Sequence, residues 1–474
     1  MNTRKGITRD GAFSNIGPLI LPLLAAATQT SSIIGRRRQR LLATDITRSK
    51  EPASIRQTFD SLWITIARSR GNVRQFQIKL ERPGARSRYG LLERHDIVPT
   101  TVLQELRRSY ERQLQIMHDL AVAGASVPPP DESQLLVLGR QIAEILPQDV
   151  RQEIIAAVQR ARQRRRVLRV VLEVANDARE LLGVPWELMA LPLGWGARDD
   201  IGEDSFLLLN ANVTLIRQVQ GVGINTALIL DHPLRLQAFA ATPLYVRPID
   251  IHTTLEAIKQ AQPSNETSQH WYNGHNTLGA LQERLSESHP QVVHLLCHGE
   301  QHDVGRNVPR YDLLFTHANG YTHRVSAADL AGVLTLAPDL QLVVLQACYA
   351  GATAVSSVDE GERSRQVAES IALALVRSGI PAVIAMQGEV AQQAAAAFVR
   401  TCYTSLTRGE RLDQAVAAGR IAMRAAGGVV DWSVPVIYQG SGQNRAPWYA
   451  RLAGRFEGLL PALDSRRDAR ARQN

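Results

Sequence analysis

Two apolar runs stand out in this chain: Gln291-Val-Val-His-Leu-Leu-Cys-His-Gly299 and Leu340-Gln-Leu-Val-Val-Leu-Gln-Ala-Cys-Tyr-Ala-Gly351. Continuous Val and Leu residues closed by small residues indicate buried strands of a parallel sheet, with the segment between them as the crossover. Open α/β sheets place their ligand sites at the carboxyl ends of such strands. We therefore expect His298 and Cys348, which end the two runs, to belong to the functional site.

The two residues suit nucleophilic catalysis. A thiol is mostly protonated near neutral pH, and an imidazole within reach can take its proton and later give it to a leaving amine. We predict Cys348 as the nucleophile and His298, 50 residues earlier, as its base. Because Gly299 has no Cβ, its backbone N–H can approach a developing oxyanion together with the N–H of Cys348. Histidine before cysteine at this spacing agrees with caspases, whose Gln-Ala-Cys-x-Gly signature is nearly present, with Tyr349 fourth and glycine one place later.

Leu-Cys-His-Gly at 296–299, followed by Val-Val-Leu-Gln-Ala-Cys-Tyr-Ala-Gly, resembles the CHAT peptidases of the caspase/separase-like clan, which also contains metacaspases and gingipains. Three more blocks resemble the same family: Leu182-Gly-Val-Pro-Trp-Glu-Leu188, Ala382-Val-Ile-Ala-Met-Gln387 and Trp432-Ser-Val-Pro-Val-Ile-Tyr438. Together the blocks cover roughly residues 75–455. The resemblance implies an α/β fold, a caspase-like doubly wound, mainly parallel sheet with flanking helices, preceded by a catalytically silent caspase-like pseudo-domain.

The length of 474 residues exceeds that of a usual single domain. We expect four parts. Residues 1–70 form a poorly patterned basic segment with one helix near 55–69, residues 71–221 the pseudo-caspase-like part, residues 222–455 the catalytic domain, and residues 456–474 a basic tail. The first half carries apolar strands and helices but no matching histidine and cysteine, so the pseudo-domain rests on the resemblance.

The net charge of +9 comes from arginine clusters at 36–40, 160–166 and 466–472. Contact with nucleic acid is one interpretation. Solvated helix faces and tails are the interpretation we favour, because aromatic residues for base stacking are not interleaved. Three cysteines without paired spacing argue against a disulfide framework, and a reducing cytosol suits a free catalytic thiol.

No membrane span is expected. The apolar segment 18–27 is about ten residues long, short of the ~20 that a spanning helix needs, and it only weakly resembles a signal peptide. A cytoplasmic protein is the expectation. No Cys-x-x-Cys or His-Glu-x-x-His spacing is present, so we expect neither a metal nor another cofactor.

Other candidate residues are interpreted as structural. His294 lies deeper in the first run and is expected in the core, and Cys297 should project to the opposite face from His298. Cys402 falls on a predicted helix and is also expected in the core. The pair Trp186 and Glu187 is interpreted as a core tryptophan beside a carboxylate that orients a neighbour.

Four acidic residues are candidates for substrate binding: Asp312, Asp359, Glu360 and Glu362. They follow the histidine or the cysteine in the chain, and in this clan a preference for arginine or lysine rests on acids near such positions. Charge-assisted hydrogen bonds to these carboxylates would favour a basic residue before the scissile bond. The segment 352–365, rich in Ser, Gly and charge, suits a flexible specificity or activation loop.

Two functions remain open from the sequence. The first is a CHAT-family cysteine endopeptidase that cleaves a protein substrate. By resemblance it would be an effector of bacterial defence or cell death that a sensor protein activates. The second is a non-catalytic caspase-like interaction module whose basic surface binds a partner. His298 and Cys348 favour the first.

Overall fold

The computed structural model describes residues 59–69, 72–82, 90–96, 98–123, 129–193, 204–220, 230, 233–261, 276–303, 309–352, 354–355 and 367–440. The chain divides into two units, residues 1–57 and 58–474, and every described residue belongs to the second. The arginine clusters at 36–40 and 466–472, the apolar segment 18–27 and the tail 456–474 lie outside the described residues. The boundary expected near residue 221 stays a prediction.

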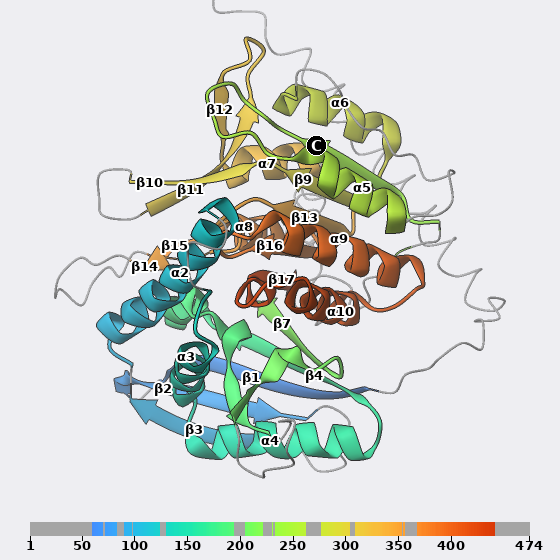
Figure 1. Ribbon diagram of the computed structural model, residues 1–474. Helices are drawn as coiled ribbons and strands as arrows, with labels where there is room; N and C mark the ends of the chain where they lie inside the picture. Colours follow the sequence, from blue (N-terminus) through green and yellow to red (C-terminus); the bar gives the residue numbers. More distant parts are fainter. Residues whose placement is uncertain are drawn as a thin grey trace, which may run out of the picture. The chain divides into compact units, whose positions relative to one another are not determined.

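One ten-stranded sheet runs through the second unit (Figure 1). Its strands, in spatial order, are β3 (Gly90–Asp96), β2 (Asn72–Glu81), β1 (Phe59–Ser69), β4 (Val167–Val174), β7 (Val213–Val219), β17 (Pro435–Gly440), β16 (Ala382–Met386), β13 (Leu342–Gln346), β9 (Val292–Leu296) and β8 (Leu236–Ala240). Strands from both halves of the chain therefore share one sheet.

The sheet is mostly parallel. Strands β1, β4, β7 and β17 run parallel to one another, and so do β16, β13, β9 and β8. The two sets meet at the antiparallel pair β16–β17, and β2 and β3 add antiparallel strands at one edge. The predicted mainly parallel α/β sheet is confirmed.

The described residues also form three smaller sheets. A three-stranded sheet contains β10 (His298–Asp303), β11 (Pro309–Thr316) and β12 (Thr322–Val325). Two pairs are β14 (Ala354–Val355) with β15 (Val367–Ala368), and β5 (Ala190–Pro192) with β6 (Asp204–Phe206). Strands β11 and β12 form a hairpin with its turn at Gly320 (φ 86°).

Helices flank the sheet. They are α2 (Thr100–Ala123), α3 (Glu132–Glu144), α4 (Gln148–Gln163), α5 (Ile251–Ala261), α6 (Leu278–Ser288), α7 (Ala327–Leu334), α8 (Ile371–Arg377), α9 (Gln392–Thr407) and α10 (Leu412–Ala425). Short 3-10 helices are η2 (Asn176–Gly183), η3 (Trp186–Leu188), η4 (Leu207–Leu209) and η5 (Asp431–Ser433). Helix α9 packs between α5 and α10, whereas α7 packs between α6 and α8, so the helices form two layers (Figure 1).

Burial explains why continuous apolar runs predicted the central strands. Every residue of β9 and β16 is buried, because helices cover both faces of these strands. The helix α7 begins with a capping box, in which the Ser326 side chain accepts from the Asp329 N–H and the Asp329 side chain accepts from the Ser326 N–H.

The helix expected at 55–69 is wrong, since residues 59–69 form strand β1. Leu62, Ile64 and Ile66 are fully buried and alternate with more exposed neighbours, which is the period of a strand. Strand β1 pairs in parallel with β4 and antiparallel with β2, so tertiary pairing fixes this segment.

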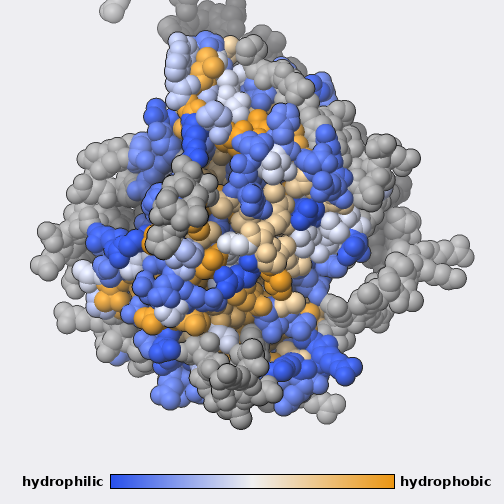
Figure 2. All heavy atoms as spheres, viewed as in Figure 1, coloured by the Kyte–Doolittle hydropathy of each residue, from blue (hydrophilic) through white to orange (hydrophobic). Residues whose placement is uncertain are grey.

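Figure 2 shows a mostly hydrophilic face with weakly hydrophobic residues gathered near its centre. In the arginine cluster at the C-terminal end of α4, Arg160 pairs with Glu153, and both Arg164 and Arg166 pair with Asp60. None of the helices that the structure describes combines the length and the apolar character needed to cross a bilayer.

Candidate active site

His298 and Cys348 follow two neighbouring strands. Strands β9 and β13 are parallel, and their last residues, Leu296 and Gln346, are partners in the register. His298 comes two residues after β9 and Cys348 two residues after β13. The two residues therefore leave the sheet side by side at its carboxyl edge, which is where the sequence predicted them.

The backbone of Gly299 lies directly on the backbone of Cys348. A Cβ at position 299 would overlap the carbonyl oxygen of Cys348, and it would lie 3.1 Å from the Cys348 carbonyl carbon and 3.6 Å from its nitrogen. Only glycine fits there. On the other side of the cysteine, Tyr349 adopts a left-handed conformation (φ 61°), which is uncommon for a residue with a side chain. This turn places Cys348 against the His298-Gly299 segment.

A hydrogen bond selects one tautomer of the neutral His298 ring. Its Nε2 lies 2.6 Å from the carbonyl oxygen of Arg247. A carbonyl can only accept, so Nε2 carries the proton and donates it to Arg247. The neutral ring therefore keeps Nδ1 free of a proton, and Nδ1 is the nitrogen able to act as a base.

Cys348 is a free, half-buried cysteine. Burial, followed by the negative charge of Glu389, raises the pKa of Cys348 to about 12. The backbone N–H groups of Cys348 and Val390 and the positive charge of Arg247 act in the opposite direction and lower this pKa. A group that takes the proton during the reaction is therefore needed.

Cys402 and His294 are core residues, as predicted, and Cys297 is buried as well. Burial raises the pKa of Cys402 to about 12, and it raises the pKa of Cys297 further. The ring of His294 is buried, with Nδ1 2.9 Å from the Tyr403 hydroxyl and Nε2 3.0 Å from Gln346 Oε1. Burial lowers the pKa of His294 to about 4, so this histidine stays neutral.

One of the four acids predicted to bind substrate can be placed. Asp312 lies on β11, opposite Glu300 of β10, and is 4% exposed. Its carboxylate is 3.2 Å from Arg310 Nε and 3.5 Å from His302 Nε2, so Arg310 already pairs with its charge. Asp359, Glu360 and Glu362 lie outside the described residues.

Three residues connected to Cys348 were not predicted: Glu389 and Arg247, whose charges act on its thiol, and His118, which contacts both of them. Glu389 follows the end of β16 by three residues, so the strand-end rule that found His298 and Cys348 also applies to it. Arg247 follows β8 at the same edge of the sheet. No pattern in the sequence indicates His118, because it comes from α2, far earlier in the chain.

With this geometry in place, comparison with known proteins gives one family. The sequence model of the CHAT domain matches residues 136–448. This chain belongs to the CHAT family. No curated protein sequence matches it.

The CHAT chain is also similar to solved structures of a complex between separase and securin from Saccharomyces cerevisiae. One, at 3.0 Å resolution, matches with a TM-score of 0.43 and 10% sequence identity. Another, at 2.6 Å resolution, matches with a TM-score of 0.36 and 10% identity. Each match covers 80% of this chain and 30% of the solved chain, so this chain spans less than a third of their length.

Exposed aromatic residues border the CHAT site. Tyr245, two residues before Arg247, is 90% exposed and has a left-handed backbone (φ 63°). Its ring stacks on that of Tyr321 from the β11–β12 turn, with ring centres 5.8 Å apart. The Leu244 N–H donates to the Gly320 carbonyl and ties the two segments together. The segment that orients His298 thus carries an open aromatic pair.

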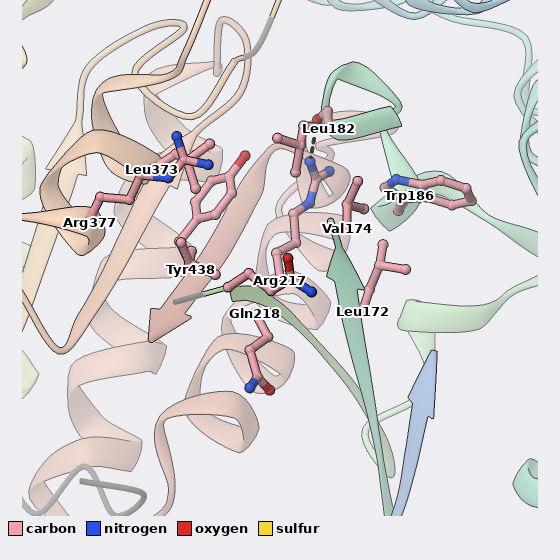
Figure 3. Close-up of a pocket in the computed structure, with 11 residues that line it drawn as sticks. Leu172, Val174, Leu182, Trp186, Arg217, Gln218, Leu373, Arg377 and Tyr438 are labelled. Carbon is pink, nitrogen blue, oxygen red and sulfur yellow. Dashed lines mark hydrogen bonds between the residues drawn. The ribbon is translucent and has the colours of Figure 1, made fainter. Parts of the chain in front are cut away.

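A small pocket lies against strands β4, β7 and β17 and helix α8. Figure 3 shows Arg217, Trp186 and Tyr438 among the residues that line it. The Arg217 guanidinium donates to the carbonyl oxygen of Leu182 (2.9 Å) and forms a buried ion pair with Glu187. Glu187 therefore orients a neighbour, as predicted. The Tyr438 hydroxyl donates to the Gly351 carbonyl (3.1 Å), so this region supports the turn after Cys348.

The described residues contain no group of three or more His, Cys, Asp or Glu side chains arranged to hold a metal ion. The described part of the site consists of protein groups that can move protons: an imidazole with a free nitrogen, a thiol, and a carboxylate in electrostatic reach.

Proposed function

We propose that this CHAT-domain protein is a cysteine endopeptidase with Cys348 as its nucleophile and His298 as its general base. The observation that carries the proposal is the close packing of Gly299 on the Cys348 backbone at neighbouring strand ends. This packing supports the proposal, because acyl transfer needs a thiol, an imidazole and a backbone N–H close together.

The mechanism follows from the hydrogen bond to Arg247. His298 keeps its Nε2 proton, so its Nδ1 takes the proton of the Cys348 thiol while Sγ bonds to the substrate carbonyl carbon. The carbonyl oxygen gains negative charge, which the N–H groups of Gly299 and Cys348 stabilise. His298 then gives its Nδ1 proton to the leaving amine as the C–N bond breaks. Water, activated by the same Nδ1, hydrolyses the thioester.

We further propose that the enzyme cleaves after a basic residue. Glu389 supports this preference, since its charge reaches the thiol of Cys348. Glu111 of α2 and Glu389 both act on the adjacent Tyr349, where their charges raise its pKa after burial. Arginine could pair with such carboxylates, whereas aspartate would meet like charge. The predicted roles of Asp312, Asp359, Glu360 and Glu362 stay proposals.

The biological setting rests on the resemblance to the family. We propose a protein substrate and an effector role in bacterial defence or cell death, with a sensor protein as activator. The neutral resting thiol supports regulation by a partner, because a thiol with a pKa of about 12 is a weak nucleophile until a base and a substrate are aligned.

The raised pKa of Cys348 also favours the second candidate function, a non-catalytic interaction module. If no partner or substrate aligns His298 with the thiol, Cys348 remains protonated and inert. An active-site thiol probe such as a peptidyl acyloxymethyl ketone separates the two functions, since only an enzyme with a competent base reacts rapidly with it at neutral pH.

Cleavage of a library of peptides tests the proposal directly. Cys348→Ala and His298→Ala should each lower kcat/KM about a thousandfold or more, because members of such a unit act together. Circular dichroism should show that both variants keep the fold. The matched control is Cys297→Ala, which removes a buried thiol from the neighbouring segment. Retained cleavage in Cys348→Ala with loss in Cys297→Ala would contradict the assignment.

A further inference from the structure

Helix α2 lies along the loop that follows β16. Contacts run in order along one face of the helix: Arg107 with Gln387, Leu114 with Gly388, and His118 with Glu389. Arg107 Nη2 donates to the Gln387 carbonyl oxygen at 2.6 Å. The contacting helix residues are seven and four positions apart, which keeps them on one face. The loop continues to Val390, whose N–H acts on the Cys348 thiol.

His118 connects two charged side chains. Its Nδ1 lies 3.2 Å from Glu389 Oε2, and its Nε2 lies 2.8 Å from Arg247 Nη1. A guanidinium only donates and a carboxylate only accepts. A neutral imidazole protonated on Nδ1 satisfies both partners at once, so the surroundings select this tautomer. The side chains of His118 and Glu389 are each about 30% exposed, which leaves the bridge partly shielded from water.

The two partners of His118, Arg247 and Glu389, act on the candidate catalytic residues His298 and Cys348. The Arg247 carbonyl accepts the hydrogen bond that fixes the ring of His298. Glu389 and Arg247 act with opposite signs on the Cys348 thiol. A single side chain on α2 therefore holds the segment that orients the base and the acid that faces the nucleophile.

We propose that His118 is a positioning residue of this active site: by bridging Arg247 and Glu389, it holds the carbonyl that orients His298. The inference rests on the proposed function. It places α2 in the catalytic unit, although α2 precedes residues 136–448, which the CHAT-domain model matches.

Three variants of α2 test the inference. His118→Leu removes both hydrogen bonds. His118→Gln can restore them, because an amide accepts from Arg247 through its oxygen and donates to Glu389 through its nitrogen. Gln115→Ala is the matched control, since Gln115 is exposed on the same helix and its side chain donates to Asp119 rather than to the site. Thermal unfolding of each variant reports whether the fold is intact.

Two readouts are measured on the full chain. The first is peptide cleavage, where His118→Leu should lower kcat about 10- to 100-fold with KM changed less than about twofold, because a misplaced base slows chemistry more than binding. The second is the rate of Cys348 alkylation by iodoacetamide against pH, mapped by mass spectrometry. The pH midpoint of alkylation should be higher in His118→Leu. In that variant Glu389 loses the hydrogen-bond donor His118 Nδ1, and Arg247 loses the acceptor His118 Nε2 that holds its guanidinium.

His118→Gln should recover most of the cleavage rate and the wild-type alkylation midpoint, and Gln115→Ala should match the wild type. Wild-type behaviour of His118→Leu in both readouts would overturn the inference. Failure of His118→Gln to recover either readout, in a folded protein, would also overturn it, because only packing of the imidazole would then matter. If the wild type cleaves no peptide, the proposed function fails, and the alkylation midpoint alone decides the role of His118.

Discussion

The thiol of Cys348 lies in the fields of two opposite charges. Glu389 raises its pKa, Arg247 lowers it, and burial outweighs both. Glu389 is also 3.2 Å from His118, so the state of that bridge changes how much negative charge the thiol experiences. Small movements of the Glu389 or Arg247 side chain would therefore change the pKa of Cys348.

Replacing Glu389 with glutamine should make the thiol more acidic. Removal of a negative charge lowers the pKa of Cys348, and below that pKa each unit of decrease gives about ten times more thiolate. Iodoacetamide should therefore alkylate Cys348 faster in Glu389→Gln at pH 8 than in the wild type. The control Glu300→Gln removes an acid that is paired with Arg324 on β12 and should leave the rate unchanged. An unaltered rate in Glu389→Gln would show that its charge does not reach the sulfur.

The elements that the sequence predicted well are those whose pattern has one interpretation. Val292–Leu296 and Leu342–Gln346 belong to apolar runs too short for buried helices, and the structure places them as strands β9 and β13. Strand β1 was missed, because its alternation at Leu62, Ile64 and Ile66 stands beside Ser and Arg residues that weaken the pattern. His298 and Cys348 could be predicted from strand ends. His118 could not, because only packing of α2 brings it to the site.

A buried ion pair stabilises the junction of the two sets of strands. Arg217 on β7 and Glu187 on η3 are each at most 3% exposed, and Arg217 also donates to the carbonyls of Leu182 and Val184. Glu187→Gln leaves the guanidinium charge buried without its partner, which should cost about 3–5 kcal/mol of unfolding free energy. Urea denaturation measures this loss.

The matched control is Asp339→Asn, which breaks an exposed pair with Arg235 (3.0 Å) and should cost about 0–1 kcal/mol. Equal losses of unfolding free energy in Glu187→Gln and Asp339→Asn would mean that burial of Arg217 does not increase the cost of removing its partner.

The two halves of the chain share one hydrophobic sheet, which bears on whether either half is stable alone. A fragment of residues 225–474 lacks β7, the parallel partner of β17, and it also lacks the surface of β7 on which α10 packs. We expect this fragment to bind the dye ANS and to aggregate, because it exposes apolar surface and an open strand edge. A fragment of residues 58–474, which keeps the whole sheet, should stay monodisperse. Size-exclusion chromatography distinguishes the two, and a soluble, fully active 225–474 fragment would show that the halves are independent.

Strand β17 sits between β7 and β16 although it is the last strand of the sheet to be synthesised. Chains emerge from the ribosome from the N-terminus, so β7 and β16 are both made before the strand that joins them. During that interval each presents an unpaired edge to its surroundings, and such edges pair readily with other chains. An mRNA truncated before the codon for Pro435 would therefore yield an aggregation-prone polypeptide. Chaperones and proteases of the cell would have to remove it.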